Sequence, residues 1–331
     1  MSSFAIKVEN LTKEFDGFRA LDEITFSVKK GELFGLLGPN GAGKTTTLNI
    51  LSTLLCATSG TTEVAGFSTG CSDEVRSRIG MVFQEPALDG ELTGRENLEF
   101  HGWMYGMSDS EIRKRSKAVL ELVELTDKAD VLVNNYSGGM KRRLEIARGL
   151  MHEPEVLFLD EPTLGLDVQT RRHIWEYVKK LNEKEKVTIV LTTHYLEEAD
   201  FLCGRVAIID KGRIVALDSP AKLKDSIGGD VVSLEASGSE AEWAKALKAA
   251  AWLNSVSRHD GVVDFVVERG ERHIPELLRV AQKLGFEVSS VTLHKPSLED
   301  VFVHFTGKSI REQEASSEDR ARAFARRHFR R

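Results

Sequence analysis

Eight residues from Gly38 to Thr45 have the spacing of a phosphate-binding loop, Gly-x-x-x-x-Gly-Lys-Thr. Glycines let a backbone wrap phosphates with its N–H groups, a lysine supplies a point charge for the β- and γ-phosphates, and a threonine hydroxyl can ligate Mg²⁺. The apolar run Leu33–Leu37 precedes the loop, and the helix-compatible run Thr46–Leu55 follows it. The predicted phosphate site consists of Gly38, Pro39, Asn40, Gly41, Ala42, Gly43, Lys44, Thr45 and Thr46.

Two carboxylates, Asp160 and Glu161, end the apolar run Val156–Leu159. The carboxyl ends of strands face the ligand crevice in open α/β sheets, so this pair can lie beside bound phosphates. Asp160 suits the metal, as a ligand or in its second shell, and Glu161 suits a base that polarises the attacking water. Without the phosphate loop, we would interpret the two carboxylates as capping the turn before Pro162. The presence of the loop in the same chain favours a catalytic role for them.

The segment Tyr136–Leu150 reads YSGGMKRRLEIARGL. Ser137 is a residue type that caps helices, and free N–H groups at a helix amino end bind anions. The periodicity by itself fits a plain helix start equally well. The segment resembles the signature of ATP-binding-cassette (ABC) ATPases, and this resemblance implies that Ser137, Gly138 and Gly139 contact nucleotide.

The resemblance covers about the first 220 residues and places further positions in family order. It implies that Phe15 stacks on adenine and that His194 reads the γ-phosphate. It also implies that Gln84 lies near Mg²⁺ and the membrane partner, and that Leu166-Asp167 forms the D-loop. Alone, Phe15 and His194 would more often be core or surface residues, so these roles depend on the ordered set of motifs.

Two positions depart from the family pattern. Met140 replaces the glutamine that is commonest after the signature glycines, and its contacts become apolar because it lacks an amide. Phe15 replaces a more usual tyrosine but keeps a ring face for stacking. The signature segment together with Pro296–Phe302 resembles the daunorubicin-resistance-type branch of ABC exporters, whose C-terminal domain ends in such a helix.

Composition excludes several classes of protein. The chain has 331 residues, 41% apolar and 29% charged, which suffices for one large core and a second, smaller one. A net charge of −6 argues against a nucleic-acid partner, which would need an excess of Lys and Arg. Three cysteines without ligand spacing fit a reducing compartment, and no stretch approaches the roughly 20 apolar residues that span a bilayer. We therefore expect a cytoplasmic chain.

The elements that must position these motifs indicate an α/β fold. Nearly continuous apolar runs at Leu33–Leu37, Val156–Leu159 and Thr188–Leu191 predict parallel strands buried on both faces. Alternating runs between Phe4 and Val28 predict a small antiparallel sheet, and helical periodicity dominates from Thr93 to Met151. With the resemblance, this implies a P-loop NTPase of the ABC cassette type, with a RecA-like core, an antiparallel β subdomain and a helical subdomain at about 93–151.

The composition changes at KDSIGGD, which predicts an ABC ATP-binding domain at 1–228 and a second domain at 229–307. The order strand, helix, two strands, helix, strand and final helix predicts a small ferredoxin-like α/β domain. We expect it to support dimerisation and regulation, since it has no phosphate loop and its histidines lack ligand spacing. Residues 308–331 predict a flexible charged tail, whose six arginines between Arg320 and Arg331 could contact anionic lipid.

These predictions combine into an ATP hydrolase that powers a separate ABC-2-type permease through ATP-driven dimer closure. Lys44, Thr45 and Thr46 would hold phosphates and Mg²⁺, with Gln84 and Asp160 near the metal. Ser137 and Gly139 would act on the nucleotide of the other subunit, in a homodimer or a heterodimer with a second cassette. The permease would be contacted through Gln84–Leu92, which would hold the chain on the inner face of the cell membrane. The aromatics of Phe100–Tyr105 could contribute, although core packing is their favoured role.

Two alternatives belong to different classes. The first is a soluble ABC ATPase acting on DNA, ribosomes or iron–sulfur assembly. Family members that act on DNA have long coiled coils between these motifs, whereas only 93 residues without sustained heptads separate Lys44 from Ser137, and members that act on ribosomes usually have two cassettes, whereas this chain has one. A catalytically inactive regulatory cassette is the second alternative. The presence of Lys44, Glu161 and His194 argues against it.

Overall fold

The computed structural model describes residues 3–248, 250–259 and 261–307, and the chain divides into two compact units. The first comprises Met1–Leu37 and Ala42–Ile214, and the second comprises Gly38–Gly41 and the chain from Val215 onward. The charged tail expected at 308–331 lies outside the described residues.

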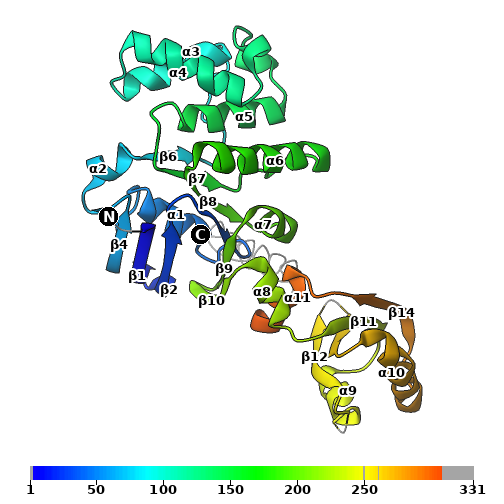
Figure 1. The fold of residues 1–331 in the computed structure, drawn as a ribbon. Coiled ribbons are helices and arrows are strands. Elements are labelled where there is room, and N and C mark those ends of the chain that lie inside the picture. Colours follow the sequence, from blue (N-terminus) through cyan, green and yellow to red (C-terminus); the bar gives the residue numbers. More distant parts are fainter. Residues whose placement is uncertain (1–2, 249, 260, 308–331) are drawn as a thin grey trace, which may run out of the picture. The chain divides into compact units, whose positions relative to one another are not determined.

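A six-stranded sheet has the order β10-β9-β3-β8-β7-β6 (Figure 1). The pairs β3–β8, β3–β9, β7–β8 and β6–β7 are parallel. All residues of β3, β7 and β8 are buried, which explains their continuous apolar sequences and confirms the three predicted parallel strands. The strands are β3 (Leu33–Leu37), β6 (Ile79–Val82), β7 (Val156–Asp160), β8 (Thr188–Thr193), β9 (Arg205–Asp210) and β10 (Arg213–Asp218).

The predicted antiparallel sheet is present and larger than expected. Its order is β2-β1-β4-β5, and β1 and β2 are each twelve residues long. Alternating burial along β1 and β2 leaves one face of the sheet partly wet, as the alternating sequence predicts. The strands are β1 (Phe4–Phe15), β2 (Phe18–Lys29), β4 (Ser59–Val64) and β5 (Phe67–Ser68).

Between β6 and β7 the chain is helical, as predicted, and lies at one end of the first unit (Figure 1). Capping boxes at Thr93/Glu96 and Ser108/Glu111 start α3 and α4, so local sequence determines where these helices begin. Two 3₁₀ turns, Thr126–Lys128 and Val133–Asn135, lead to α5. The helices of the first unit are α1 (Lys44–Leu51), α2 (Ser72–Arg76), α3 (Gly94–Met104), α4 (Asp109–Leu122), α5 (Gly138–Gly149), α6 (Val168–Glu185) and α7 (Leu196–Leu202).

The predicted core packing of the aromatics near the end of α3 is wrong for Phe100 and Trp103. Phe100 and Trp103 are 56% and 55% exposed, as is Met104 beside them at 69%, and do not belong to the helix core, whereas Tyr105 stacks on the ring of His152. Helical periodicity shows that these side chains share a face, but it cannot show whether another helix covers that face. In the structure, this face of α3 is exposed.

The second unit contains the predicted order of elements, with an antiparallel sheet of order β12-β13-β11-β14. Trp243 and Phe265 meet edge to face in its core, with ring centroids 5.1 Å apart. Leu298, Val301 and Phe302 are all buried, as their helical spacing predicts. The elements are α8 (Pro220–Asp225), β11 (Asp230–Ala236), α9 (Glu240–Ala246), β12 (Leu253–His259), β13 (Val262–Val267), α10 (Gly270–Leu284), β14 (Val288–His294) and α11 (Leu298–Thr306).

Among the described residues, no helix has both the length and the apolar character needed to cross a membrane.

Candidate functional site

Three neighbouring parallel strands bring the predicted catalytic residues to one edge of the sheet. β8 lies between β3 and β7, so the loop after β3, the carboxylates at the end of β7 and His194 after β8 emerge side by side. Register supports this, because Leu37 is paired with Thr193 and Asp160 with Thr192. Residues far apart in the sequence thus meet at the edge where open α/β sheets bind ligands.

Asp160 is the centre of a small hydroxyl cluster. Thr45 Oγ1 donates to Asp160 Oδ1 across 3.3 Å, and Thr192 Oγ1 donates to the same oxygen across 2.5 Å. Burial raises the pKa of Asp160 above its usual range, with the Glu161 charge adding to the effect, against the hydrogen bonds from Thr192 and Thr45. The cluster presents hydroxyl and carboxyl oxygens of the kind that Mg²⁺ prefers.

Glu161 lies between two basic side chains. Its Oε1 is 3.2 Å from Lys44 Nζ, and its Oε2 is 3.3 Å from His194 Nδ1. Lys44 and Glu161 are 4% and 7% exposed, which makes this a desolvated ion pair. Although burial alone raises the pKa of Glu161, the His194 ring and the Lys44 charge outweigh it, so the pKa is lowered and the group is a carboxylate at neutral pH.

The backbone at Glu161 is held in the left-handed region, at φ 44°. A residue with a Cβ adopts this conformation at a cost in free energy, and such positions are concentrated in functional sites. Here Glu161 N donates to Thr192 Oγ1 across 3.0 Å and to the Thr192 carbonyl across 3.2 Å. Thr192 therefore orients both carboxylate residues, and the sequence motifs gave no sign of this role.

The loop glycines meet two different requirements. Gly41 and Gly43 have φ of 78° and 111°, which favours glycine at both positions. At Gly43 a Cβ would also lie 2.6 Å from Leu21 Cδ2. The N-cap of α1 is Gly43, which has no side chain to cap the helix, and helix amino ends of this kind bind phosphate.

The signature segment begins α5, as predicted. Ser137 is the N-cap, and its hydroxyl accepts from Met140 N across 3.3 Å. Gly139 is needed for close packing, because a Cβ there would lie 2.6 Å from Thr170 Cγ2 on α6. In the described chain, neither Ser137 nor Gly139 forms a hydrogen bond with the Lys44, Asp160 and Glu161 group.

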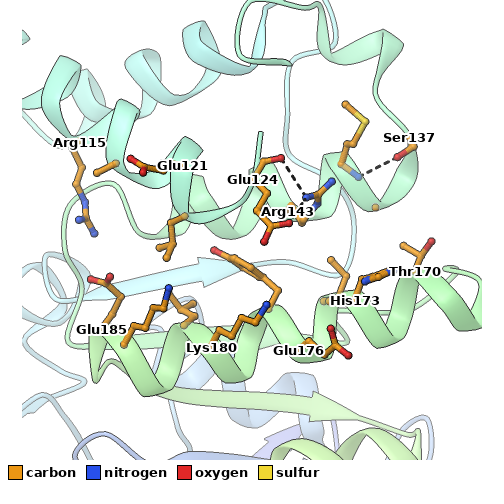
Figure 2. A pocket seen from close by; sticks show the side chains of 18 residues that line it. Arg115, Glu121, Glu124, Ser137, Arg143, Thr170, His173, Glu176, Lys180 and Glu185 are labelled. Carbon is orange, nitrogen blue, oxygen red and sulfur yellow. Dashed lines mark hydrogen bonds and ion pairs between the residues drawn. The ribbon is translucent and has the colours of Figure 1, made fainter. Parts of the chain in front are cut away.

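A groove of about 780 Å³ separates α4 and α5 from α6. Arg115 and Glu185 lie at one end of it, and Ser137 and Thr170 lie at the other (Figure 2). Its walls mix cationic and anionic side chains, with Arg143 and Lys180 among the cations. The signature end of α5 therefore opens onto a cavity instead of being packed away.

Two predicted site residues lie apart from the buried group. Phe15 ends β1 and is 42% exposed, with Lys13 Nζ 4.8 Å from its ring centroid. Gln84 follows β6 in an exposed loop. In the described structure it forms no hydrogen bond with Thr45 or Asp160.

A buried arginine connects that loop to the backbone on both sides of Glu161, and sequence reasoning missed it. Arg142 on α5 donates to the carbonyls of Pro162, Phe83 and Asp160 across 2.7, 2.6 and 3.0 Å. It also pairs with Glu145 across 2.9 Å, while Glu145 Oε1 accepts from Ala87 N across 2.7 Å. Placement one turn beyond the signature glycines was the available signal, but helix periodicity could not distinguish these buried charges from surface ones.

Glu198 is a second missed residue. It is fully buried on α7, four positions after His194, and accepts from Thr163 Oγ1 and Trp175 Nε1 across 2.8 Å each. Burial raises the pKa of Glu198 above its usual range, against the hydrogen bonds it accepts. It therefore connects the helix after His194 to the segment after Glu161.

Two family models match the chain. One, described as ABC transporter, matches residues 21–164, and one described as ATP-binding protein DrrA1-3-like, C-terminal domain, matches residues 219–306. The first match includes the phosphate loop, the signature and both carboxylates. The second covers most of the second unit.

Two relatives match nearly the whole chain, and a solved structure matches its first part. The linearmycin resistance ATP-binding protein LnrL of Bacillus subtilis is 41% identical over 311 residues, 93% of this chain and 100% of that protein. The daunorubicin resistance ATP-binding protein DrrA2 of Streptomyces coeruleorubidus is 41% identical over 325 residues, 95% of this chain and 99% of that protein. Among solved structures, the ATP-binding cassette MJ0796, a dimer in a post-hydrolysis state bound to ADP and Pi, is 34% identical. The alignment covers 65% of this chain and 98% of that cassette, with a TM-score of 0.57.

Proposed function

Because this chain belongs to the family of ABC transporter ATP-binding proteins and is an ATP hydrolase of that kind, we propose that it powers export through a separate membrane subunit. The observation that carries the proposal is the buried group formed by Lys44, Asp160, Glu161 and His194 at the edge of the parallel sheet. The export direction is supported by the relatives, which are named for resistance to linearmycin and daunorubicin.

ATP binding is assigned to the loop and the start of α1. Gly38–Gly43 would wrap the phosphates with N–H groups, and Lys44, Thr45 and Thr46 would contact them directly. Thr45 and Asp160, whose oxygens lie 3.3 Å apart, fit Mg²⁺, and Gln84 would complete its surroundings. The metal would neutralise phosphate charge. Phe15, exposed at the end of β1, would stack on adenine.

Glu161 is assigned as the base that polarises the attacking water. Its lowered pKa keeps it ionised, and its carboxylate lies between the Lys44 ammonium and the His194 ring. Phosphates that bind Lys44 would compete with Glu161 for the ammonium and release the carboxylate to polarise water. His194, on the other side of Glu161, would contact the γ-phosphate and stabilise the charge that develops on it.

The complete ATP site requires two chains. Within one chain, Ser137 and Gly139 form no hydrogen bond with the Lys44 group among the described residues, although both belong to an anion-binding type of helix end. The MJ0796 cassette, which resembles this chain, is a dimer with ADP and Pi bound. We therefore assign Ser137, Gly138 and Gly139 to the nucleotide of the partner subunit, in a homodimer or a heterodimer with a second cassette.

The membrane partner is assigned as an ABC-2-type permease that contacts Gln84–Leu92. The exposed face of α3 formed by Phe100, Trp103 and Met104 adds apolar area to this surface. Arg142 would transmit the contact, because one guanidinium bonds to the carbonyl of Phe83 in the loop and to that of Asp160 beside the base. The chain would thus lie on the inner face of the cell membrane.

Mixing two defective variants tests the shared site. Lys44→Ala and Ser137→Arg chains should each be inactive, because one lacks the phosphate ammonium and the other blocks the signature helix end. An equal mixture should regain up to about a quarter of the specific activity of wild-type dimers, since about half of its dimers are heterodimers and each contains one intact site of two, assembled from both chains. ATP turnover measures this, and a mixture that stays inactive while heterodimers are demonstrated contradicts the assignment.

The domain division at 1–228 and 229–307 is retained as part of the proposal. A chain ending at Ser226 should still bind ATP, because Lys44, Asp160, Glu161 and His194 all precede that residue. It should dimerise less readily or transport less, since the second domain supports dimerisation. ATP-site labelling, light scattering and transport in cells separate these effects. Loss of ATP binding in a well-folded truncated chain would refute the separation of roles.

A further inference from the structure

β14 is the last strand of the sheet in the second unit. It pairs with β11 on one side, and no strand among the described residues pairs with the other side (Figure 1). Val291 and Leu293 on this strand are 37% and 40% exposed. The apolar alternation of Val288–Leu293 predicts a face turned toward helices, and Val291 and Leu293 are covered there only in part.

The two edges of this sheet differ in chemistry. β12, at the opposite edge, carries Arg258 and His259 and has a register shift between Leu253 and Ser255. Charges and irregularities of this kind discourage pairing with another chain. β14 also has a register shift, between Val288 and Ser290, but it pairs regularly from Ser290 to His294 and reads VSSVTLH, with no Asp, Glu, Lys or Arg in seven residues. From Ser290 to His294 its open edge therefore has neither charged side chains of this kind nor an irregularity.

An apolar strip follows the open edge. Val291 and Leu293 lie on the helix-covered face, because their partners Leu234 and Val232 are core residues. Helical spacing places Leu278 of α10 on the flank opposite His273, which stacks on Trp252 beside β12. Leu278, which is 38% exposed, therefore lies on the flank of α10 that is nearer to β14, and we count it with the strip.

The sequence around β14 is complementary to itself. If two copies pair antiparallel about a two-fold axis at Val291, each residue meets the one equally far on the other side of Val291. Leu293 then meets Ser289 of the second copy, and no charged residue of the strand meets another. Beyond the strand, Glu287 meets Lys295 at both ends, and the Lys295 ammonium, 86% exposed, has donors beyond its bond to Asp230.

We propose that the β14 edge is the surface through which two copies of this chain join their C-terminal domains, forming a continuous eight-stranded sheet. Backbone hydrogen bonds along the edge supply affinity, the apolar strip of Leu278, Val291 and Leu293 adds burial, and the Glu287–Lys295 pairs set the register. The inference rests on the proposed function in that both require two chains, but it concerns a different surface.

Cysteine cross-linking tests the register in the full-length, nucleotide-free chain. Cys56 and Cys71, which are exposed, are first replaced by serine. Val291→Cys places its side chain directly opposite its mate, about 4.5–5.5 Å between Cβ atoms, so mild oxidation should produce a covalent dimer. Leu293→Cys is the matched control, because the two copies of residue 293 would be about 13 Å apart along the strands and should not cross-link.

A charge variant tests the affinity. Val291→Lys brings two lysines together at an exposed position. The protein should therefore fold normally, while the dissociation constant of the dimer should rise at least about tenfold. Asn254→Lys, on the exposed opposite edge, should leave dimerisation unchanged. Sedimentation at several concentrations measures both.

Three results would overturn the edge pairing: a chain that stays monomeric, dimers without the Val291→Cys cross-link, or equal cross-linking of Leu293→Cys. If one of these results is found while the mixture of Lys44→Ala and Ser137→Arg chains still regains activity, only the edge pairing is refuted. Normal cross-linking with failed restoration would instead remove the shared ATP site.

Discussion

Replacement of Glu161 by glutamine should lower ATP turnover by about 10²–10⁴-fold, because the neutral amide cannot polarise the attacking water or accept its proton. ATP binding should persist, since the phosphate-binding groups at Lys44 and Thr45 are untouched. The amide also cannot form the ion pair with the Lys44 ammonium that the carboxylate forms at 3.2 Å. Lys44 is then more available to phosphate, and an ATP-bound dimer should accumulate.

Phosphate release measures the loss of ATP turnover, and light scattering measures the accumulation of the ATP-bound dimer. Glu153→Gln is the matched control, because that side chain is 74% exposed and forms an ion pair with Arg115, away from the Lys44 group. It should retain normal turnover. Substantial activity in purified Glu161→Gln protein would remove Glu161 from the role of base.

Replacement of Arg142 by methionine should lower the free energy of unfolding by about 3–5 kcal/mol, the usual effect of breaking a buried ion pair from one side. The variant leaves Glu145, which is 1% exposed, without its cation and removes donors from the carbonyls of Phe83, Pro162 and Asp160. Turnover should fall as well, because the segment that holds Glu161 loses two of its supports.

Urea denaturation of two further variants checks the cause. Replacing both Arg142 and Glu145 by methionine should be less destabilising than Arg142→Met alone, since no unpaired charge stays buried. Arg113 is an exposed residue of α4, so Arg113→Met should change the free energy of unfolding by less than about 0.5 kcal/mol. Equal losses in the single and double variants would show that the charge pairing contributes little.

Much of the fold was predictable because local sequence and burial act directly on these elements. Continuous apolar runs marked β3, β7 and β8, since strands buried on both faces exclude polar residues except at their ends. Polar residues at those ends, Asp160 and the loop before Lys44, indicated the edge at which a ligand binds. Ser137 was recognisable as a helix cap because capping is a local interaction.

The sequence by itself thus determined the order of elements, the chemical groups of the site and the family, because motifs and periodicity are local properties. Only the tertiary structure decided which groups meet. Thr192 bonds to the Asp160 carboxylate from 32 residues away in the chain, and Arg142 bonds to the Asp160 backbone carbonyl from 18 residues away. It also decided which apolar faces stay uncovered, at α3 and at the β14 edge, because a repeat of apolar residues specifies a face but not its partner.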